Sequence, residues 1–424
     1  MKTAIVIGAG ARGTRYSEMM KAMGCDMKVI AVAEPIDNRR EYIGDMFDIP
    51  KDMRHLSWED LLSVPKFADF AIIATQDRDH IAPAMAAIEK GYDLLLEKPM
   101  GATPEECVKI AHAAEEKGVC VLVCHVLRFT KFFRGLKNII DSGAIGHVVH
   151  IQHAECVGNL HQSHSFVRGN WKNSEESAPM ILAKSCHDMD ILSYLVGSEC
   201  KKIHSFGGLM YFRPENAPEG APDFCIEGCP HKDECNYYAP RVYLEIFDRE
   251  SFPTAVTKTR CPSDEELLEA LRTTNYGRCV FKCPNDVVDH QTVNIEYESG
   301  ATVSFTMCAF NKGSRNIRIM GTEGEIIANM GDPFYTVFDF KTRQYKKIEI
   351  ENAVTDETIG GGHGGGDGGI VQALAKRLDG DTSDKAICTI AETCKNHLIA
   401  FAAEESRLTG TVVSFDEYVK RYGL

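Results

Sequence analysis

The N-terminal stretch "KTAIVIGAGARGTRYSEMMKAM" constrains the fold more than any other part of the chain. An apolar run of strand length leads into a glycine-rich turn and a helical pattern, and Gly8, Gly10 and Gly13 have the spacing G-x-G-x-x-G. Gly8 permits a tight turn, Gly10 lets a pyrophosphate approach the backbone, and Gly13 lets the helix pack closely on the strand. The sequence therefore predicts a dinucleotide-binding turn whose helix start, at Ala11 and Arg12, faces the phosphates.

The second predicted strand, "KVIAVAEP", ends at Glu34, roughly 20 residues after Gly13. An acidic side chain there is expected to bind the ribose 2′-hydroxyl and to repel a 2′-phosphate, which favours NAD over NADP. Arg39 and Arg40 follow closely, and a nearby arginine can hold a 2′-phosphate. NADP is therefore kept as the less favoured alternative.

More strand–helix units follow the second strand. Residues 67–91 and 92–118 each show a buried strand followed by a helix, and residues 119–129 supply another strand. This alternation predicts a Rossmann domain with a doubly wound parallel sheet over residues 1–123. Ligands bind beyond the carboxyl ends of such strands. The polar residues at those ends are expected to bind the cofactor, with Arg128 reserved for the substrate: Thr75, Gln76, His80, Glu97 and Lys98.

Length and charge limit the remaining possibilities. A chain of 424 residues exceeds one average domain, so we expect two. The net charge of −14 argues against nucleic acid or an anionic membrane as a partner. No run approaches the roughly 20 apolar residues of a membrane span, and the N-terminus lacks the pattern of a leader peptide. We therefore expect a cytoplasmic protein.

Residues 124–424 differ in pattern from the first domain. Segments such as "VVHIQHAECVG", "DHQTVNIEYES" and "ATVSFTMCAF" alternate like strands and are separated by turn residues, and helical patterns follow near the C-terminus. The prediction is an α+β domain with a large open, mostly antiparallel sheet. A cysteine-containing insertion is expected around residues 213–285.

The segment Met180–Val196 shows a helical pattern with polar residues on one flank. Lys184, His187 and Asp188 lie at i, i+3 and i+4, and Asp190 lies one turn after His187, where it could orient the imidazole. This spacing lets Lys184 and His187 point together into a site, where Asp188 is expected to bind the substrate. The alternative is an ordinary helix with a solvated polar rim.

Three further segments carry candidate residues. "NLHQSHSFVRGNW" offers His164 and Trp171 for a sugar, and the alternative is a surface loop. The flexible "GGGHGGGDGG" carries His363.

In "CIEGCPHKDEC" a structural zinc ion is a possible interpretation, while an iron–sulfur cluster or incidental reduced thiols are the alternatives. The cysteines of that segment are Cys225, Cys229 and Cys235.

The motifs "GAGARG", "AEP", "ATQDRDH" and "LLLEKPMG" together resemble those of the Gfo/Idh/MocA oxidoreductases. The resemblance continues through "HDMDIL" and "RIMGTEGEI" and implies a Rossmann domain followed by an α/β domain whose open sheet covers the nicotinamide. It implies NAD(P)-linked oxidation or reduction of a sugar or polyol, in a homodimer or homotetramer formed through that sheet.

The resemblance also implies roles for single residues. It places Lys98 beside the nicotinamide and the reacting hydroxyl, and His187 with Asp190 matches the family's H-x-x-D pattern. Inositol dehydrogenase-like members have an acid four residues before that histidine, where this chain has Ala183. Lys184 is then expected to act as a second cation or base. Similar "HGGGD" segments lie near the substrate mouth, which supports His363.

Three functions are compatible with these observations. The first is hydride transfer between nicotinamide and a hydroxyl-bearing carbon of a sugar, polyol or glycoside. The second is cleavage of a glycoside through transient oxidation, elimination and return of the hydride. The third is a nucleotide-binding regulatory protein without catalysis, which the presence of Lys98 and His187 disfavours.

Overall fold

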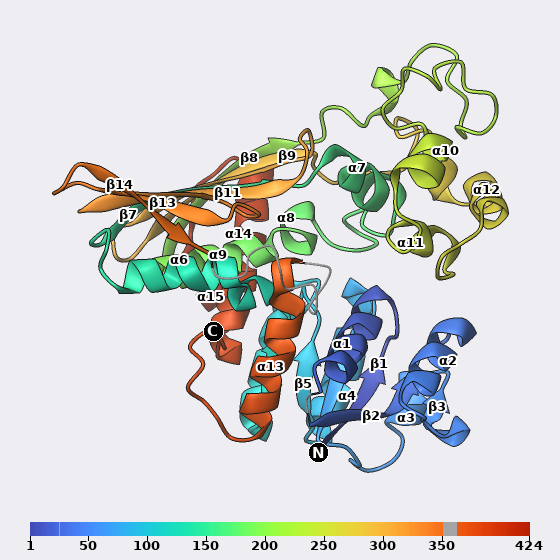
Figure 1. Cartoon of the computed structure of the whole chain (residues 1–424), viewed down its shortest axis with the longest axis horizontal. Helices are drawn as coiled ribbons and strands as arrows, with labels where there is room; N and C mark the ends of the chain where they lie inside the picture. The colour runs from blue at the N-terminus through green and yellow to red at the C-terminus, as the bar shows by residue number, and fades with distance from the viewer. Residues whose placement is uncertain (25, 351–362) are drawn as a thin grey trace.

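Two sheets and their helices make up the chain, and the computed structural model describes residues 1–24, 26–350 and 363–424 (Figure 1). The first sheet is parallel, in the order β3-β2-β1-β4-β5-β6, which confirms the predicted doubly wound domain. Its strands are β1 Lys2–Ile7, β2 Met27–Ala33, β3 Arg54–His55, β4 Phe70–Ile73, β5 Asp93–Leu96 and β6 Val121–Val123. Its helices are α1 Ala11–Ala22, α2 Asp37–Met46, α3 Trp58–Leu61, α4 Ile81–Glu89 and α5 Pro104–Lys117.

The central strands are apolar along their length because both of their faces are covered. Successive residues of β1 pack into different cores, Ile5 and Ile7 into one and Ala4 and Val6 into the other. Helix α5 begins where the Thr103 hydroxyl accepts a hydrogen bond from the Glu106 N–H, and it ends at Gly118.

The glycine turn follows β1 and leads directly into α1. Gly8 has a φ of +89°, and a Cβ at this residue would lie 2.5 Å from the Ala74 carbonyl oxygen. A Cβ on Gly13 would lie 1.9 Å from the Gly8 carbonyl oxygen, so only glycine lets α1 approach the turn. At Gly10 the nearest atom to an added Cβ is an Arg39 guanidinium nitrogen at 3.8 Å. The loop is therefore tight behind Gly8 and Gly13 and open over Gly10.

The second sheet has the order β14-β13-β12-β11-β7-β10-β9-β8-β15. Among the strand pairings described for this sheet, only β7–β10 is parallel. This confirms the predicted large, mostly antiparallel sheet. Helices lie along one of its faces in Figure 1, and none of the described helices lies on the other face, which is called the uncovered face below. Its strands are β7 Val148–Cys156, β8 Cys200–Gly208, β9 His290–Tyr297, β10 Thr302–Cys308, β11 Ser314–Gly321, β12 Gly324–Asn329, β13 Phe334–Asp339, β14 Gln344–Glu349 and β15 Val413–Ser414.

The C-terminal helices connect the two parts of the molecule. Helix α13 (Gly366–Leu378) packs against α1 and the short helix η3 (Val126–Phe129), and its Ile370 and Leu374 share a core with the first domain. Helix α14 (Ile390–Thr409) contacts α5, α8 and α9 as well as β8. The remaining helices on this side are α6 Lys131–Asp141, α8 Met180–Ala183, α9 Cys186–Val196 and α15 Phe415–Arg421. No helix among the described residues is long and apolar enough to cross a bilayer.

The cysteine-containing segment forms a small body beside the sheet, at the upper right of Figure 1. Its helices are α10 Ala239–Arg241, α11 Pro253–Thr257 and α12 Asp264–Thr273, and it packs against α7 Asn159–His161 and the following turn η4 Gln162–Arg168. That turn places His164 in an aromatic core, where its Nδ1 lies 2.9 Å from the Tyr243 hydroxyl and its ring stacks on Tyr276. His164 is only 3% exposed, so it is a core residue here and not the substrate ligand that the sequence indicated.

The burial of His164 predicts acid sensitivity of this body. Burial lowers the pKa of His164 to about 3, so the unfolded chain takes up a proton at a higher pH than the folded chain does. Stability is therefore expected to fall as the pH drops below about 6.5, the ordinary histidine pKa. His164→Phe should be less stable at neutral pH, because Tyr243 loses its partner, but its melting temperature should depend less steeply on pH. The exposed His112→Phe is the control, and equal slopes for all three proteins would contradict the prediction.

Candidate active site

Glu34 lies beside the glycine turn at the end of β2. Its carboxylate accepts hydrogen bonds from the N–H groups of Ala9 at 2.8 Å and Ile36 at 3.0 Å, and the residue is 5% exposed. Arg40 donates to the Glu34 carbonyl and pairs with Asp37, so its guanidinium is already engaged. Together with the open space over Gly10, this arrangement fits a dinucleotide whose ribose hydroxyls bind a carboxylate.

Arg12 and Glu97 meet in a charge network below the turn. The Arg12 guanidinium lies 2.6 Å from Glu97 and 2.7 Å from Asp367 on α13, and the Tyr16 hydroxyl donates to Glu97 at 2.6 Å. Burial alone would raise the pKa of Glu97, but Arg12 and Lys98 outweigh it and lower the pKa. An ionised Glu97 then accepts from the Lys98 N–H at 2.9 Å, which orients the strand end that carries Lys98.

The residues after β4 connect the two domains. His80 is 1% exposed, with its ring nitrogens 2.7 Å from the Pro99 carbonyl and 3.2 Å from the Thr75 carbonyl. The Trp171 indole donates to Asp77 at 3.0 Å, and Asn170 reaches the Gln76 side chain at 3.5 Å. Trp171, predicted to contact substrate, thus uses its N–H to dock on the first domain.

Lys98 reaches the helical segment of the second domain. Its Nζ donates to the Ala183 carbonyl at 2.9 Å. The predicted single helix is two helices, α8 and α9, separated at Lys184 and Ser185. In an unbroken helix the Ala183 carbonyl would bond to the His187 N–H, four residues on. The break leaves this carbonyl open to Lys98, and His187 lies in the first turn of the next helix.

Two further imidazoles lie beside His187. The ring of His125, which follows β6, has its centroid 6.0 Å from that of His187 and 5.0 Å from that of His397 on α14. All three residues are buried. Sequence reasoning gives His125 no role, because its neighbours on α9 and α14 are distant from it along the chain.

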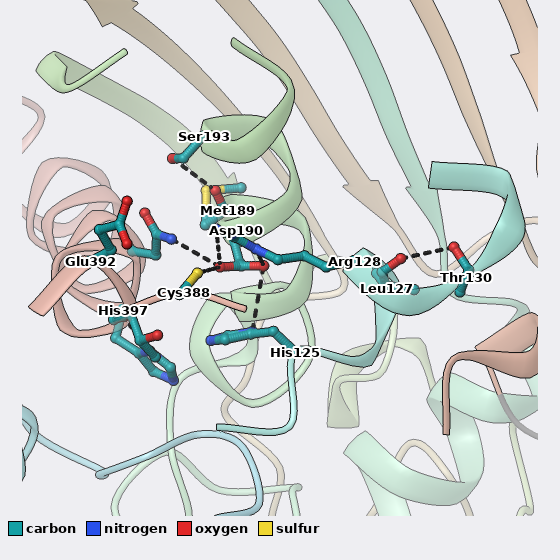
Figure 2. Close-up of polar contacts among 12 residues, drawn as sticks. His125, Leu127, Arg128, Thr130, Met189, Asp190, Ser193, Cys388, Glu392 and His397 are labelled. Atoms are coloured by element: carbon teal, nitrogen blue, oxygen red, sulfur yellow. Dashed lines mark hydrogen bonds and ion pairs between the residues drawn. The ribbon is translucent and has the colours of Figure 1, made fainter. Parts of the chain in front are cut away.

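The Asp190 carboxylate binds the Arg128 guanidinium (Figure 2). Its carboxylate accepts from the Arg128 guanidinium at 2.7 and 2.8 Å and from the Asn396 amide at 2.8 Å, and its nearest imidazole is His125 at 4.0 Å. The predicted Asp190–His187 contact is therefore wrong, because the residue after one helical turn faces η3 and α14. Arg128, predicted to bind substrate, is buried in this ion pair.

Asp188 belongs to a second buried charge network. It is fully buried and pairs with Arg315 on β11 at 2.8 Å and with His153 on β7 at 2.8 Å. Burial would raise the pKa of Asp188, but Arg315 and His153 lower it well below its usual range. Asp188 therefore anchors α9 to the sheet and is not in the predicted substrate-binding position. Lys184 extends this network, with its Nζ 3.3 Å from Glu155.

The cysteine insertion does not form the predicted zinc site. No group of three histidine, cysteine or acidic side chains among the described residues could hold a metal ion. The Cys225 sulfur lies 3.7 Å from the Arg168 guanidinium, and such a cation disfavours a metal ion at that thiol. Cys235 instead accepts a hydrogen bond from the Tyr237 N–H. Cys229 is a free, half-buried thiol.

One predicted substrate residue cannot be placed. Gly360–Gly362 and the side chain of His363 lie outside the described residues. The structure describes the glycine-rich segment from the turn η9 (His363–Gly365) onward. In this part of the segment, Asp367 forms the ion pair with Arg12. The site that the described residues form therefore consists of the glycine turn, Glu34, the Glu97–Lys98 strand end and the three imidazoles.

Family comparisons agree with this geometry. A family model described as an oxidoreductase family with an NAD-binding Rossmann fold matches residues 2–125, and that of its C-terminal α/β domain matches residues 137–352. The putative oxidoreductase YteT of Bacillus subtilis (strain 168) is 26% identical over 332 residues, which cover 73% of this chain and 72% of that protein.

Two other proteins extend the comparison. The inositol 2-dehydrogenase of Acidothermus cellulolyticus is 25% identical over 204 residues, 48% of this chain and 56% of the relative. The solved structure of levoglucosan dehydrogenase with NADH and levoglucosan has a TM-score of 0.71 and 18% identity, and the match covers 98% of this chain and 99% of that one. The latter likeness shows the fold. With both family domains matched in order over most of its length, the chain belongs to the Gfo/Idh/MocA oxidoreductase family, whose N-terminal domain is an NAD-binding Rossmann fold.

Proposed function

We propose that this protein is an NAD-dependent dehydrogenase that transfers a hydride between nicotinamide and a hydroxyl-bearing carbon of a sugar or polyol. The observation that carries the proposal is the contact of Lys98 with the Ala183 carbonyl. This contact brings a cation from the cofactor domain to the start of α9, where His187 lies. Relatives named inositol 2-dehydrogenase and levoglucosan dehydrogenase support a polyhydroxylated substrate.

Each residue of the site has a separate role in such a reaction. The bound nicotinamide would supply the hydride acceptor in the direction of oxidation. Lys98 donates a hydrogen bond to the reacting oxygen, which polarises it and fixes its position. His187 accepts the hydroxyl proton as the C–H bond breaks. Lys184 is the second cation, held in place by Glu155, and orients another substrate oxygen.

Lys98→Met tests the central role of the ammonium. We expect kcat to fall by at least about 100-fold, as is usual for a lost catalytic group, while the affinity for NAD stays within about threefold. Steady-state kinetics and calorimetric titration with NAD measure the two quantities. The exposed Lys109→Met is the matched control. An unchanged kcat would refute the assignment.

Glu34 supports NAD in preference to NADP, because its buried carboxylate lies beside the glycine turn, where it would meet the cofactor ribose. Glu34→Ala is expected to lower the ratio of kcat/KM for NAD to that for NADP by about tenfold, the effect of one lost charged hydrogen bond. Asp37→Ala removes a neighbouring exposed acid and should leave the ratio unchanged. An unaltered ratio in Glu34→Ala would exclude the ribose contact.

A panel of sugars, polyols and aryl glycosides with NAD tests the reaction type. We expect NADH to accumulate with at least one sugar or polyol, followed by its absorbance. Release of the aryl group without NADH would instead identify the hydride-returning cleavage of glycosides. Binding of NAD without turnover of any substrate would favour the regulatory alternative.

We also propose that two copies associate through the uncovered face of the second sheet (Figure 1). Val149 and Ile327 are 49% and 39% exposed on its strands, and Phe206 is 61% exposed. Exposed apolar side chains of this size on one sheet support an interface between copies.

The free thiols among the described residues suit the reducing cytoplasm, which we propose as the compartment.

A further inference from the structure

One buried imidazole at the site lacks hydrogen-bond partners. Neither ring nitrogen of His125 has a hydrogen-bond partner among the described residues, and both nitrogens are inaccessible to solvent. Buried polar groups are almost always paired, so an exception in a native site calls for a function. The neighbouring His397 differs, since its Nε2 accepts from the Met100 N–H and its Nδ1 lies 2.9 Å from the Thr393 carbonyl.

Charged and titratable groups surround His125 from four elements. Asp190 and His187 face it from α9, and its Nδ1 is 4.0 Å from the Asp190 carboxylate. The other groups around it are Arg128 on η3, Glu97 and Lys98 after β5, and His397 on α14. Of these, only Asp190 and Glu97 are anions. Asp190 is the nearer one and would stabilise a proton on the ring.

We propose that His125 receives from His187 the proton that leaves the substrate hydroxyl, with Asp190 as the positioning counter-charge. The inference rests on the proposed dehydrogenase function. In oxidation the bound nicotinamide would accept the C–H hydrogen together with its electron pair as a hydride, while the O–H proton goes to His187 and His125 then takes this proton on Nε2. Its Nδ1–H faces Asp190. The ring centroids of the two histidines are 6.0 Å apart at 82°, within reach through a small ring rotation or one water.

His125 is prepared to accept this proton at neutral pH. Burial has the largest effect on the pKa of His125 and lowers it, while the Asp190 carboxylate acts in the opposite direction and raises it. The ring is therefore uncharged before each turnover. Below the lowered pKa it would already hold a proton, so proton acceptance fails as the pH falls.

A cavity provides a route outward on another side of Asp190. Its volume is about 320 Å³, and Arg128 and Asn396, which both bind Asp190, belong to its lining together with Ser193 and Glu392. In Figure 2 Ser193 lies above Asp190 and His125 below it. The proton can thus leave through polar groups without crossing the substrate.

Chemical rescue of His125→Ala tests the proposal in the full-length protein. We expect kcat to drop by about tenfold or more and to rise again as imidazole is added, because free imidazole can carry the proton. His397→Ala is the matched control: it removes a neighbouring imidazole whose nitrogens are already bonded, and its kcat should not respond to imidazole. A kcat of His125→Ala that imidazole leaves unchanged, or equal rescue of both variants, would overturn the proposal.

A second variant covers the case in which His125→Ala does not fold. His125→Gln keeps the volume of the ring but cannot carry a proton, and its melting temperature reports folding. We expect a lowered kcat without the acidic limb that His125 gives the wild-type pH profile. A wild-type rate and profile would overturn the relay. If the wild-type protein forms no NADH with any sugar or polyol, the proposed function itself fails, which is a separate result.

Discussion

The hydrogen bond between the Lys98 ammonium and the Ala183 carbonyl joins the two domains at the site. The helical segment breaks after Ala183, so that carbonyl lies at the end of α8 and is open to the Lys98 ammonium. The same break lets α9 start anew, with His187 in its first turn. The position of the cofactor-side cation and that of the imidazole are therefore set by one local feature of the backbone.

Two buried ion pairs hold α9 in this position. Asp188 pairs with Arg315 on the sheet, and Asp190 pairs with Arg128 near the first domain. Both aspartates are fully buried, so removing either partner would leave an uncompensated charge at a cost of about 3–5 kcal/mol. Because both aspartates follow His187 on the same helix and pair with different elements, the first turns of α9 are fixed in two directions.

The sequence predicts the parts of this protein that depend on local order. Gly8 and Gly13 are required by close backbone contacts. The succession of strands and helices predicts the first sheet correctly, and alternation along the strands predicts the second. The roles of Asp188 and Asp190 depend on Arg315 and Arg128, which are distant along the chain. The spacing of residues within one helix cannot predict these partners. Similarly, the aromatic core around His164 assembles only when the insertion folds onto the η4 turn.

The most direct test of this account is a crystal structure of the protein with NAD and a substrate analogue bound. We expect the nicotinamide ring and the reacting oxygen to lie within about 4 Å of the Lys98 ammonium, with His187 in contact with the same oxygen. We also expect the cofactor ribose to bind Glu34. A nicotinamide ring directed away from Lys98, or a substrate oxygen that neither Lys98 nor His187 reaches, would contradict it.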